Sequence, residues 1–275
     1  MGHKKPVRID PLTVALPPGG ADSHAHLDSE DYDANRDEVI ARAAKVGVTY
    51  IGNVFLSPGA YRAGKDYFAD YPNIFFLLGI HPQDGASCGL DTLAEIEEIA
   101  KNDSRVAAIG EIGLDYFRDP CPKELQLQTF AKQVELAKKL DKPIVIHCRD
   151  AEEDCLTLLE AGGFKDYPLL WHCFGGDARL AKRLLHNGWS ISIPGPVTYP
   201  ANSALREAVA IIPRDKLLIE TDCPYLSPVP WRGTTNEPAY LPFTGRAVAS
   251  ARGVDPEELW LNCGDNAVTF FGLNR

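Results

Sequence analysis

Residues 123–147 read KELQLQTFAKQVELAKKLDKPIVIH, and this stretch contains the unit that decides the fold. Apolar side chains recur at helical spacing from Lys123 to Leu140, which predicts an amphipathic helix. Pro143 then separates the helix from Ile144–His147, a short apolar run that predicts a strand buried on both faces. A histidine, which is a competent metal ligand, stands at the end of that strand.

Outward from this unit, short apolar runs alternate with longer amphipathic ones along the whole chain. The predicted strands are Ala21–His26, Thr49–Phe55, Ile74–Ile80, Val106–Glu111, Ile144–His147, Leu169–His172, Trp189–Ile193 and Leu217–Glu220. The predicted helices are Asp31–Val46, Thr92–Lys101, Lys123–Leu140, Ala151–Ala161, Asp177–Asn187, Ser203–Ile212, Tyr240–Ala251 and Pro256–Phe271. This alternation indicates an α/β protein with one parallel sheet.

Both an open doubly wound sheet and a closed barrel fit the alternation. The sequence contains no G-x-G-x-x-G or P-loop motif that would favour an open nucleotide-binding sheet. Eight units within 275 residues favour a single-domain (β/α)8 TIM barrel. We expect the barrel to occupy residues 21–275, preceded by an arm at residues 1–20 that is basic and then rich in Pro and Gly.

Composition narrows the class of protein. The formal net charge is −10, so the chain as a whole does not attract nucleic acid, and a nucleic-acid substrate would need a local cationic mouth or bound metal ions. The seven cysteines form no C-x-x-C pair, and we interpret them as reduced thiols of a cytoplasmic protein. No apolar stretch is long enough to span a membrane. We expect a monomer.

Metal-competent residues stand at the ends of the apolar runs, just before the loops. They are His24, His26, His81, Glu111, His147, His172 and Asp222. All strand carboxyl ends of a (β/α)8 barrel open at the same face, where the active site lies. These side chains, scattered over two hundred positions, are therefore expected to converge in one mouth.

His24-Ala-His26 is the strongest local signal, because residues i and i+2 of a strand point to the same side and can share a cation. An isolated H-x-H is more often just two polar residues at a strand end than a metal site. Metal-competent residues at the ends of the other predicted strands make the metal site the favoured interpretation here. Glu111 has two carboxylate oxygens that could bridge two ions, and Asp222 could bind metal and accept a proton from water. Glu220 is given a structural role.

Two further expectations concern neighbouring side chains. Arg149 or Arg246 is expected to pair with Glu220. The cysteines that directly follow three proposed ligands are expected to face away from the metal, because adjacent residues of a strand point to opposite sides. They are Cys148, Cys173 and Cys223.

Four histidines with two acids are too rich in nitrogen for a single Mg²⁺ site, and imidazole suits Zn, Mn, Fe or Ni. Six ligands could hold two divalent ions around a bridging carboxylate. Two such ions suit the hydrolysis of a phosphodiester or of a carbonyl compound by a metal-activated water.

Seven segments resemble the TatD family of metal-dependent deoxyribonucleases, within the wider amidohydrolase-like barrel superfamily. They are Asp22-Ser-His-Ala-His-Leu-Asp28, Gly79-Ile-His-Pro82, Gly110-Glu-Ile-Gly-Leu-Asp-Tyr116, Ile146-His-Cys-Arg-Asp-Ala151, His172-Cys-Phe-Gly-Gly176, Glu220-Thr-Asp-Cys-Pro-Tyr-Leu226 and Asn236-Glu-Pro-Ala-Tyr-Leu241. They occur in family order from about residue 21 to the C-terminus.

The resemblance implies a TIM barrel with a two-metal site (Zn, Mn or Mg) that hydrolyses DNA phosphodiesters, often from a 3′ end. The implied metal ligands are His24, His26, Glu111, His147, His172 and Asp222. Glu111 would bridge the ions and Asp222 would orient or deprotonate the water, so these two are the catalytic residues. His81, at the rim of the pocket, Arg149 and Arg232 would bind the substrate.

Two positions depart from the family pattern, and both lie among the expected substrate contacts. Gln83 stands where the family usually has His, and Thr235 stands where it usually has Arg. A two-metal hydrolase of a small ester, lactone or amide is therefore the alternative to a nuclease that acts on DNA ends. For Arg149 and Arg232, hydrogen bonds to substrate phosphate and ion pairs at the protein surface are equally expected. Five aromatic residues near the mouth are candidates for base stacking, although each is more often packing: Tyr116, Phe117, Phe174, Tyr225 and Trp231.

Overall fold

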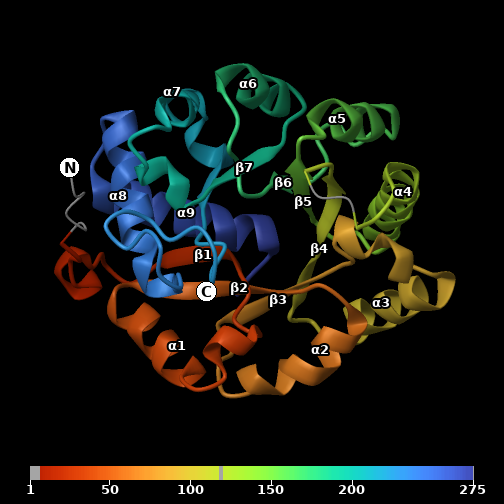
Figure 1. Ribbon diagram of the computed structural model, residues 1–275, viewed down its shortest axis with the longest axis horizontal. Coiled ribbons are helices and arrows are strands. Elements are labelled where there is room, and N and C mark those ends of the chain that lie inside the picture. Colours follow the sequence, from red (N-terminus) through yellow and green to blue (C-terminus); the bar gives the residue numbers. More distant parts are fainter. Residues whose placement is uncertain (1–6, 118–119, 275) are drawn as a thin grey trace.

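A computed structural model describes residues 7–117 and 120–274, and it is a nearly closed barrel of eight parallel strands (Figure 1). The strands hydrogen-bond in chain order, as the alternating pattern predicts. They are β1 (Gly20–Ala25), β2 (Val48–Phe55), β3 (Ile74–Leu78), β4 (Val106–Asp115), β5 (Ile144–Arg149), β6 (Leu169–Trp171), β7 (Ser190–Ile193) and β8 (Leu217–Ile219). The predicted (β/α)8 TIM barrel is confirmed.

The last gap in the barrel closes beyond the end of β8. Ala25 of β1 forms an isolated parallel bridge with Cys223, and the amide of His26 donates to the carbonyl oxygen of Cys223 at 2.8 Å. The amide of Asp222 donates in turn to the carbonyl oxygen of His24 at 2.9 Å. Closure therefore places the end of β1 directly beside the segment that follows β8.

Helices surround the strands (Figure 1). They are α1 (Arg36–Lys45), α2 (Pro58–Gly64), α3 (Leu90–Asn102), α4 (Lys123–Lys139), α5 (Glu152–Ala161), α6 (Ala178–His186), α7 (Ser203–Ile211), α8 (Leu241–Arg252) and α9 (Pro256–Phe271). Eight of them match predicted helices within a few residues, apart from the start of α1. The sequence reading missed α2, a short helix that Pro58 begins and the Ser57 side chain caps. It also started α1 too early, because Glu30–Tyr32 forms a separate 3₁₀ turn.

Strand β4 extends four residues beyond its predicted end at Glu111. Its register with β5 is irregular between Ile109 and Ile112, and it then continues with Gly113 opposite His147. Gly113 has φ +146°, and a Cβ there would lie 1.9 Å from the carbonyl oxygen of His147. Only glycine permits this close approach, so the strand passes Glu111 and also brings Asp115 to the mouth.

Two apolar clusters form the core. The larger one lies mainly between the strands and the surrounding helices. The smaller one joins strand side chains such as Val54, Leu77 and Leu218 to Ala267 and Phe271 of α9. Figure 1 shows α9 near the middle of the ring, behind strands in this view. Helix α9 thus covers one end of the barrel, which leaves the other end for chemistry.

Residues 7–20 of the predicted arm lie against the barrel. The Trp231 indole donates to the carbonyl oxygen of Ile9, and the Trp260 indole donates to that of Pro17, at 2.9 and 2.8 Å. Arg246 donates to the carbonyl oxygen of Val14 at 3.1 Å. The first six residues of the arm lie outside the described part of the chain. No described helix has both the length and the apolar character needed to cross a membrane.

Candidate metal centre

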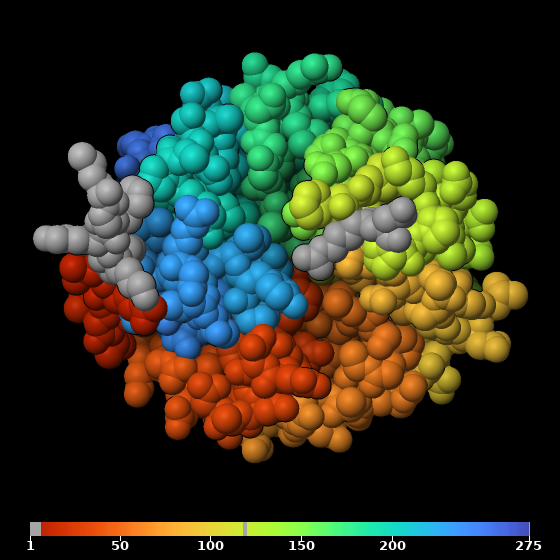
Figure 2. Space-filling model, in the orientation of Figure 1, coloured from red at the N-terminus to blue at the C-terminus, as the bar shows by residue number. Residues whose placement is uncertain are grey.

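The mouth of the barrel brings together all six residues that the sequence proposes as metal ligands. His24 lies in β1, Glu111 in β4 and His147 in β5, while His172 directly follows β6. His26 and Asp222 follow β1 and β8, and each stands next to a residue of the Ala25–Cys223 bridge that closes the barrel. In Figure 2 a hollow opens near the middle of the visible face, between the blue, green and orange parts of the chain.

Glu111 lies at the centre of this group, and its two carboxylate oxygens face different partners. Oε2 is 3.3 Å from His24 Nε2 and 3.8 Å from His26 Nε2. Oε1 is 2.5 Å from His147 Nδ1 and 2.8 Å from His172 Nε2. One buried carboxylate therefore divides the ligands into two sets.

Asp222 belongs to the set on the Oε2 side. Its Oδ1 is 3.5 Å from His26 Nε2 and 3.8 Å from His24 Nε2. The residue has φ +55°, a left-handed conformation that aspartate tolerates better than most residues do. Its side chain is 13% exposed, so it is the acid of the centre that solvent reaches most readily.

The donor set fits divalent cations. Four groups of three residues have ligand atoms within 4.8 Å of one another: His24 with His172 and Asp222, His24 with His26 and Glu111, Glu111 with His147 and His172, and His81 with Asp115 and His147. Both ring nitrogens of His24 are buried, and neither has a well-aligned hydrogen bond to any residue that the structure describes. An orphaned imidazole is costly unless a ligand that is not a side chain satisfies it, and a metal ion does so.

The two acids of the centre are held anionic. Burial by itself would raise the pKa of Glu111, but the charges of His172 and His147 and their hydrogen bonds hold that pKa well below its usual range. Burial also opposes ionisation of Asp222, and the hydrogen bond from His26 and the charge of His172 outweigh it, so the pKa of Asp222 is lowered. The mouth thus keeps two negative charges that favour cations.

Two histidines are held neutral. Burial lowers the pKa of His24, and the adjacent charge of His172 lowers it further. Burial also lowers the pKa of His81 to about 4. Neutral imidazole is the form that can donate a lone pair to a metal or to a substrate proton.

His81 lies deeper than the rim at which the sequence placed it. Its Nε2 is 3.8 Å from Glu111 Oε1, its side chain is 13% exposed, and its ring packs edge-on against the ring of His147. Its Nδ1 accepts the backbone N–H of Gln83. The Gln83 side chain donates to Asp115 Oδ2 at 2.9 Å.

The expectation that Arg149 or Arg246 pairs with Glu220 is wrong. The fully buried Glu220 accepts the backbone N–H of Cys173 at 2.6 Å and lies 3.4 Å from His172 Nδ1. Arg246 donates to backbone carbonyl groups of the arm, and Arg149 stacks on Phe117 instead. Glu220 needs no arginine because the His172 ring and the backbone amide of Cys173 stabilise its carboxylate.

The expectation that all three cysteines face away from the centre is wrong for Cys173. Its Sγ is 3.7 Å from Asp222 Oδ2, and its φ of +49° breaks the alternation of an extended strand. Strand β6 already ends at Trp171, so the rule for strand neighbours no longer applies. All seven cysteines are free thiols.

Sequence reasoning missed two buried acids beside the centre. Asp115 Oδ2 is 3.2 Å from His147 Nε2, and a longer β4 would have revealed it. Asp22 accepts hydrogen bonds from the amide of Thr221 at 2.9 Å and from its hydroxyl at 2.5 Å. Asp22 stands two residues before His24, and this spacing places it on the same strand. Nothing in the spacing indicates its hydrogen bonds to Thr221, a residue far away in the sequence.

The two arginines proposed to bind substrate are exposed at the mouth and stack on aromatic rings. The Arg149 guanidinium is 3.6 Å from the ring centroid of Phe117, and that of Arg232 is 4.4 Å from the ring centroid of Tyr199. Neither arginine has a salt bridge to a described acid within 4.0 Å. The alternative that they form surface ion pairs therefore has no support in the described residues.

The five aromatic candidates for base stacking differ in exposure. Phe117 and Tyr225 are 56% and 61% exposed, and the Tyr225 ring lies edge-on to His26. Phe174 is fully buried and belongs to the core. Trp231 stacks on Tyr240. Tyr116 is half-buried and donates a hydrogen bond to Asp154.

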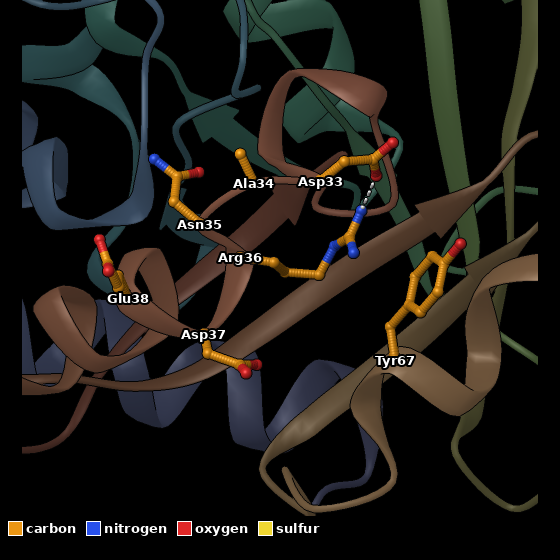
Figure 3. A pocket seen from close by; sticks show the side chains of 7 residues that line it. All are labelled: Asp33, Ala34, Asn35, Arg36, Asp37, Glu38 and Tyr67. Atoms are coloured by element: carbon orange, nitrogen blue, oxygen red, sulfur yellow. Dashed lines mark hydrogen bonds and ion pairs between the residues drawn. The ribbon is translucent and has the colours of Figure 1, made fainter.

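A separate surface depression of about 410 Å³ lies where α1 begins. Figure 3 shows Arg36 extending between Asp33 and Tyr67, with an ion pair to Asp33 at 2.8 Å. The residues that line it include no histidine and no member of the metal centre. The depression therefore does not compete with the barrel mouth as the site of chemistry.

Sequence comparison agrees with this geometry. Residues 21–272 match the family described as TatD related DNase. The chain belongs to the TatD family. The relative YabD of Bacillus subtilis (strain 168), named an uncharacterized metal-dependent hydrolase, is 38% identical over 253 residues, which cover 92% of this chain and 99% of that protein.

Two further TatD proteins support the assignment. The "3'-5' ssDNA/RNA exonuclease TatD" of Citrobacter rodentium (strain ICC168) is 36% identical over 92% of this chain and 97% of its own length. The crystal structure of YJJV, a TatD homolog from Escherichia coli K12, superposes with a TM-score of 0.86 and 26% identity, covering 93% and 98% of the two chains. The chain is thus a metal-dependent hydrolase of the TatD family.

Proposed function

We propose that this TatD protein cleaves phosphodiester bonds at the ends of DNA strands, with two divalent metal ions per chain. The observation that carries the proposal is the position of Glu111, whose two oxygens face different ligand atoms at neighbouring positions. His24, His26 and Asp222 would hold one ion, and His147 and His172 would hold the other. Zn, Mn or Mg would be the metal, with imidazole-rich coordination favouring Zn or Mn.

Two bound divalent ions would lower the pKa of water and stabilise the negative charge that builds up on a phosphodiester during cleavage. The protein's own part is to position the reactants. Asp222, anionic and solvent-accessible, would orient the attacking water and accept its proton. Glu111 would keep the two ligand sets at a fixed separation.

Substrate would approach along the exposed rim. Arg149 and Arg232 present planar donors suited to phosphate oxygens, and their stacking on Phe117 and Tyr199 limits their rotamers. His81, which is neutral, would contact the reacting phosphate. The relative named as a single-stranded DNA and RNA exonuclease supports the choice of strand ends as the substrate.

A digestion assay tests the proposal. We expect end-labelled single-stranded oligonucleotides to be shortened stepwise with Mn²⁺ or Mg²⁺, and to stay intact with chelator. Asp222→Asn should abolish cleavage with little loss of folding, whereas Asp66→Asn, at an 83% exposed side chain, should not alter it.

A small ester, lactone or amide is the alternative substrate. It draws support from Gln83, whose side chain is committed to Asp115 at a position where the family usually places a histidine. A panel of such compounds should be cleaved far more slowly than oligonucleotides. Intact oligonucleotides together with rapid cleavage of a lactone or amide would reject the nuclease.

A further inference from the structure

His147 and His172 present different ring nitrogens to the same oxygen of Glu111. His147 uses Nδ1 and His172 uses Nε2, and these two nitrogens are 3.5 Å apart. A neutral imidazole carries its proton on one nitrogen only, so a ring that binds metal through one nitrogen must keep the proton on the other. The two rings must therefore adopt opposite tautomers for both to serve one centre.

A buried carboxylate faces the outer nitrogen of each ring. Asp115 Oδ2 is 3.2 Å from His147 Nε2, and Glu220 Oε1 is 3.4 Å from His172 Nδ1. The side chains of Asp115 and Glu220 are 2% and 0% exposed, so water does not compete for these contacts. Asp115 is a hydrogen-bond acceptor at the nitrogen on which His147 must carry its proton. Glu220 Oε1 lies beside His172 Nδ1 without a well-aligned hydrogen bond, and its negative charge favours a proton on that nitrogen.

We propose that Asp115 and Glu220 are positioning residues that select opposite tautomers of His147 and His172. The selection directs Nδ1 of one ring and Nε2 of the other toward the metal. This inference rests on the proposed metal centre and assigns to it two residues that are not themselves ligands in that centre.

Local hydrogen bonds hold both carboxylates in place. Asp115 Oδ1 accepts the backbone N–H of Phe117 at 3.0 Å, and Asp115 Oδ2 faces His147 and the Gln83 side chain. Glu220 differs, because its Oε1 faces both the N–H of Cys173 and the ring of His172. Glu220 Oε2 is buried without a partner among the described residues.

This difference predicts unequal effects of amide substitutions. In Asp115→Asn the fixed backbone N–H of Phe117 keeps the amide oxygen, because the Gln83 side-chain amide can rotate to present its own oxygen to the new NH₂ group. The NH₂ group then faces His147 Nε2 and favours the wrong tautomer. In Glu220→Gln the N–H of Cys173 also keeps the amide oxygen, but that oxygen is the one that faces His172. Glutamine therefore preserves the selected tautomer, and Glu220→Leu removes it.

Calorimetric titration with Zn²⁺ tests the inference. We expect Asp115→Asn and Glu220→Leu each to weaken binding by about 10- to 100-fold, the usual effect of losing such a partner, and Glu220→Gln to weaken it less. Gln83→Ala is the matched control, since it removes the hydrogen bond from the Gln83 side chain to Asp115 Oδ2 and leaves the contact between Asp115 and His147. Its Zn²⁺ affinity should stay close to that of the wild type.

Nitrogen-15 NMR of the histidines in the zinc-loaded wild-type protein reads the tautomers without any substitution. We expect the proton on Nε2 of His147 and on Nδ1 of His172. The opposite assignment, or wild-type affinity in both Asp115→Asn and Glu220→Leu, would overturn the inference. So would a third bound ion that Asp115→Asn alone removes, because Asp115 would then be a ligand. A wild-type protein that binds no metal would instead reject the proposed function.

Discussion

Asn53→Ala is a sharp test of how the barrel positions its metal ligands. Asn53 lies in β2 and is fully buried, and its Oδ1 accepts the backbone N–H groups of Leu27 at 2.8 Å and Asp28 at 3.3 Å. These two amides directly follow His26. The side chain of Asn53 therefore holds the loop that begins at one of the proposed ligands.

The expected loss follows from the two amides. The N–H of Leu27 becomes a buried donor without an acceptor, at a cost of about 1–3 kcal/mol, while that of the half-buried Asp28 regains water and costs about 0.5–1 kcal/mol. The sum is roughly 1.5–4 kcal/mol in the free energy of unfolding. For a chain of this size that corresponds to a fall in Tm of about 4–10 °C.

The assay is urea and thermal unfolding, together with Zn²⁺ titration. Asn73→Ala is the matched control, because Asn73 donates a single hydrogen bond, to the carbonyl oxygen of Thr49, just before β3 and away from the ligands. It should cost only about 1 kcal/mol and leave metal affinity unchanged. Asn53→Ala should lower both stability and affinity. Equal destabilisation by the two variants, or wild-type affinity in Asn53→Ala, would refute the reasoning.

Four further outcomes are expected. Removal of metal by a chelator should lower the Tm by roughly 10 °C, since a ligand at a thousand times its Kd adds about 4 kcal/mol to the free energy of unfolding. An unchanged Tm, measured by calorimetry, would contradict a bound metal. Arg149→Ala should raise KM for oligonucleotides by about 10- to 100-fold with little change in kcat, and equal KM values in steady-state kinetics would exclude a phosphate contact. Gly113→Ala should lower the free energy of unfolding, measured in urea, by at least about 3 kcal/mol, because the new Cβ would meet the carbonyl oxygen of His147. Gly163→Ala, at φ +73° with no atom nearby, should lower it by only about 1 kcal/mol. Similar losses in the two variants would argue against the close approach at Gly113. Burial raises the pKa of Tyr167 to about 12, from 10 in the unfolded chain. The unfolded state therefore loses its proton first, and stability falls as pH rises from 10 to 12. Tyr167→Phe should reduce the slope of stability against pH in this range, measured by urea unfolding, and an unchanged slope would contradict the prediction.

The sequence by itself determined the barrel and its six candidate ligands. Buried parallel strands must be apolar on both faces, and this requirement leaves a clear pattern of short apolar runs between amphipathic helices. A polar residue at the end of such a run, as at His147 or His172, stands out against its neighbours. The shared carboxyl face of the fold then implies that these residues meet.

Only the tertiary structure decided how the ligands are supported. Strand β4 continues past Glu111 and brings Asp115 to the mouth, and Gly113 permits this by its close approach to β5. Glu220 and Asp115 take their partners from other strands, at ring nitrogens and amides that no spacing in the sequence specifies. A local pattern records which residues are buried, whereas the partner of a buried charge depends on atoms brought together by barrel closure.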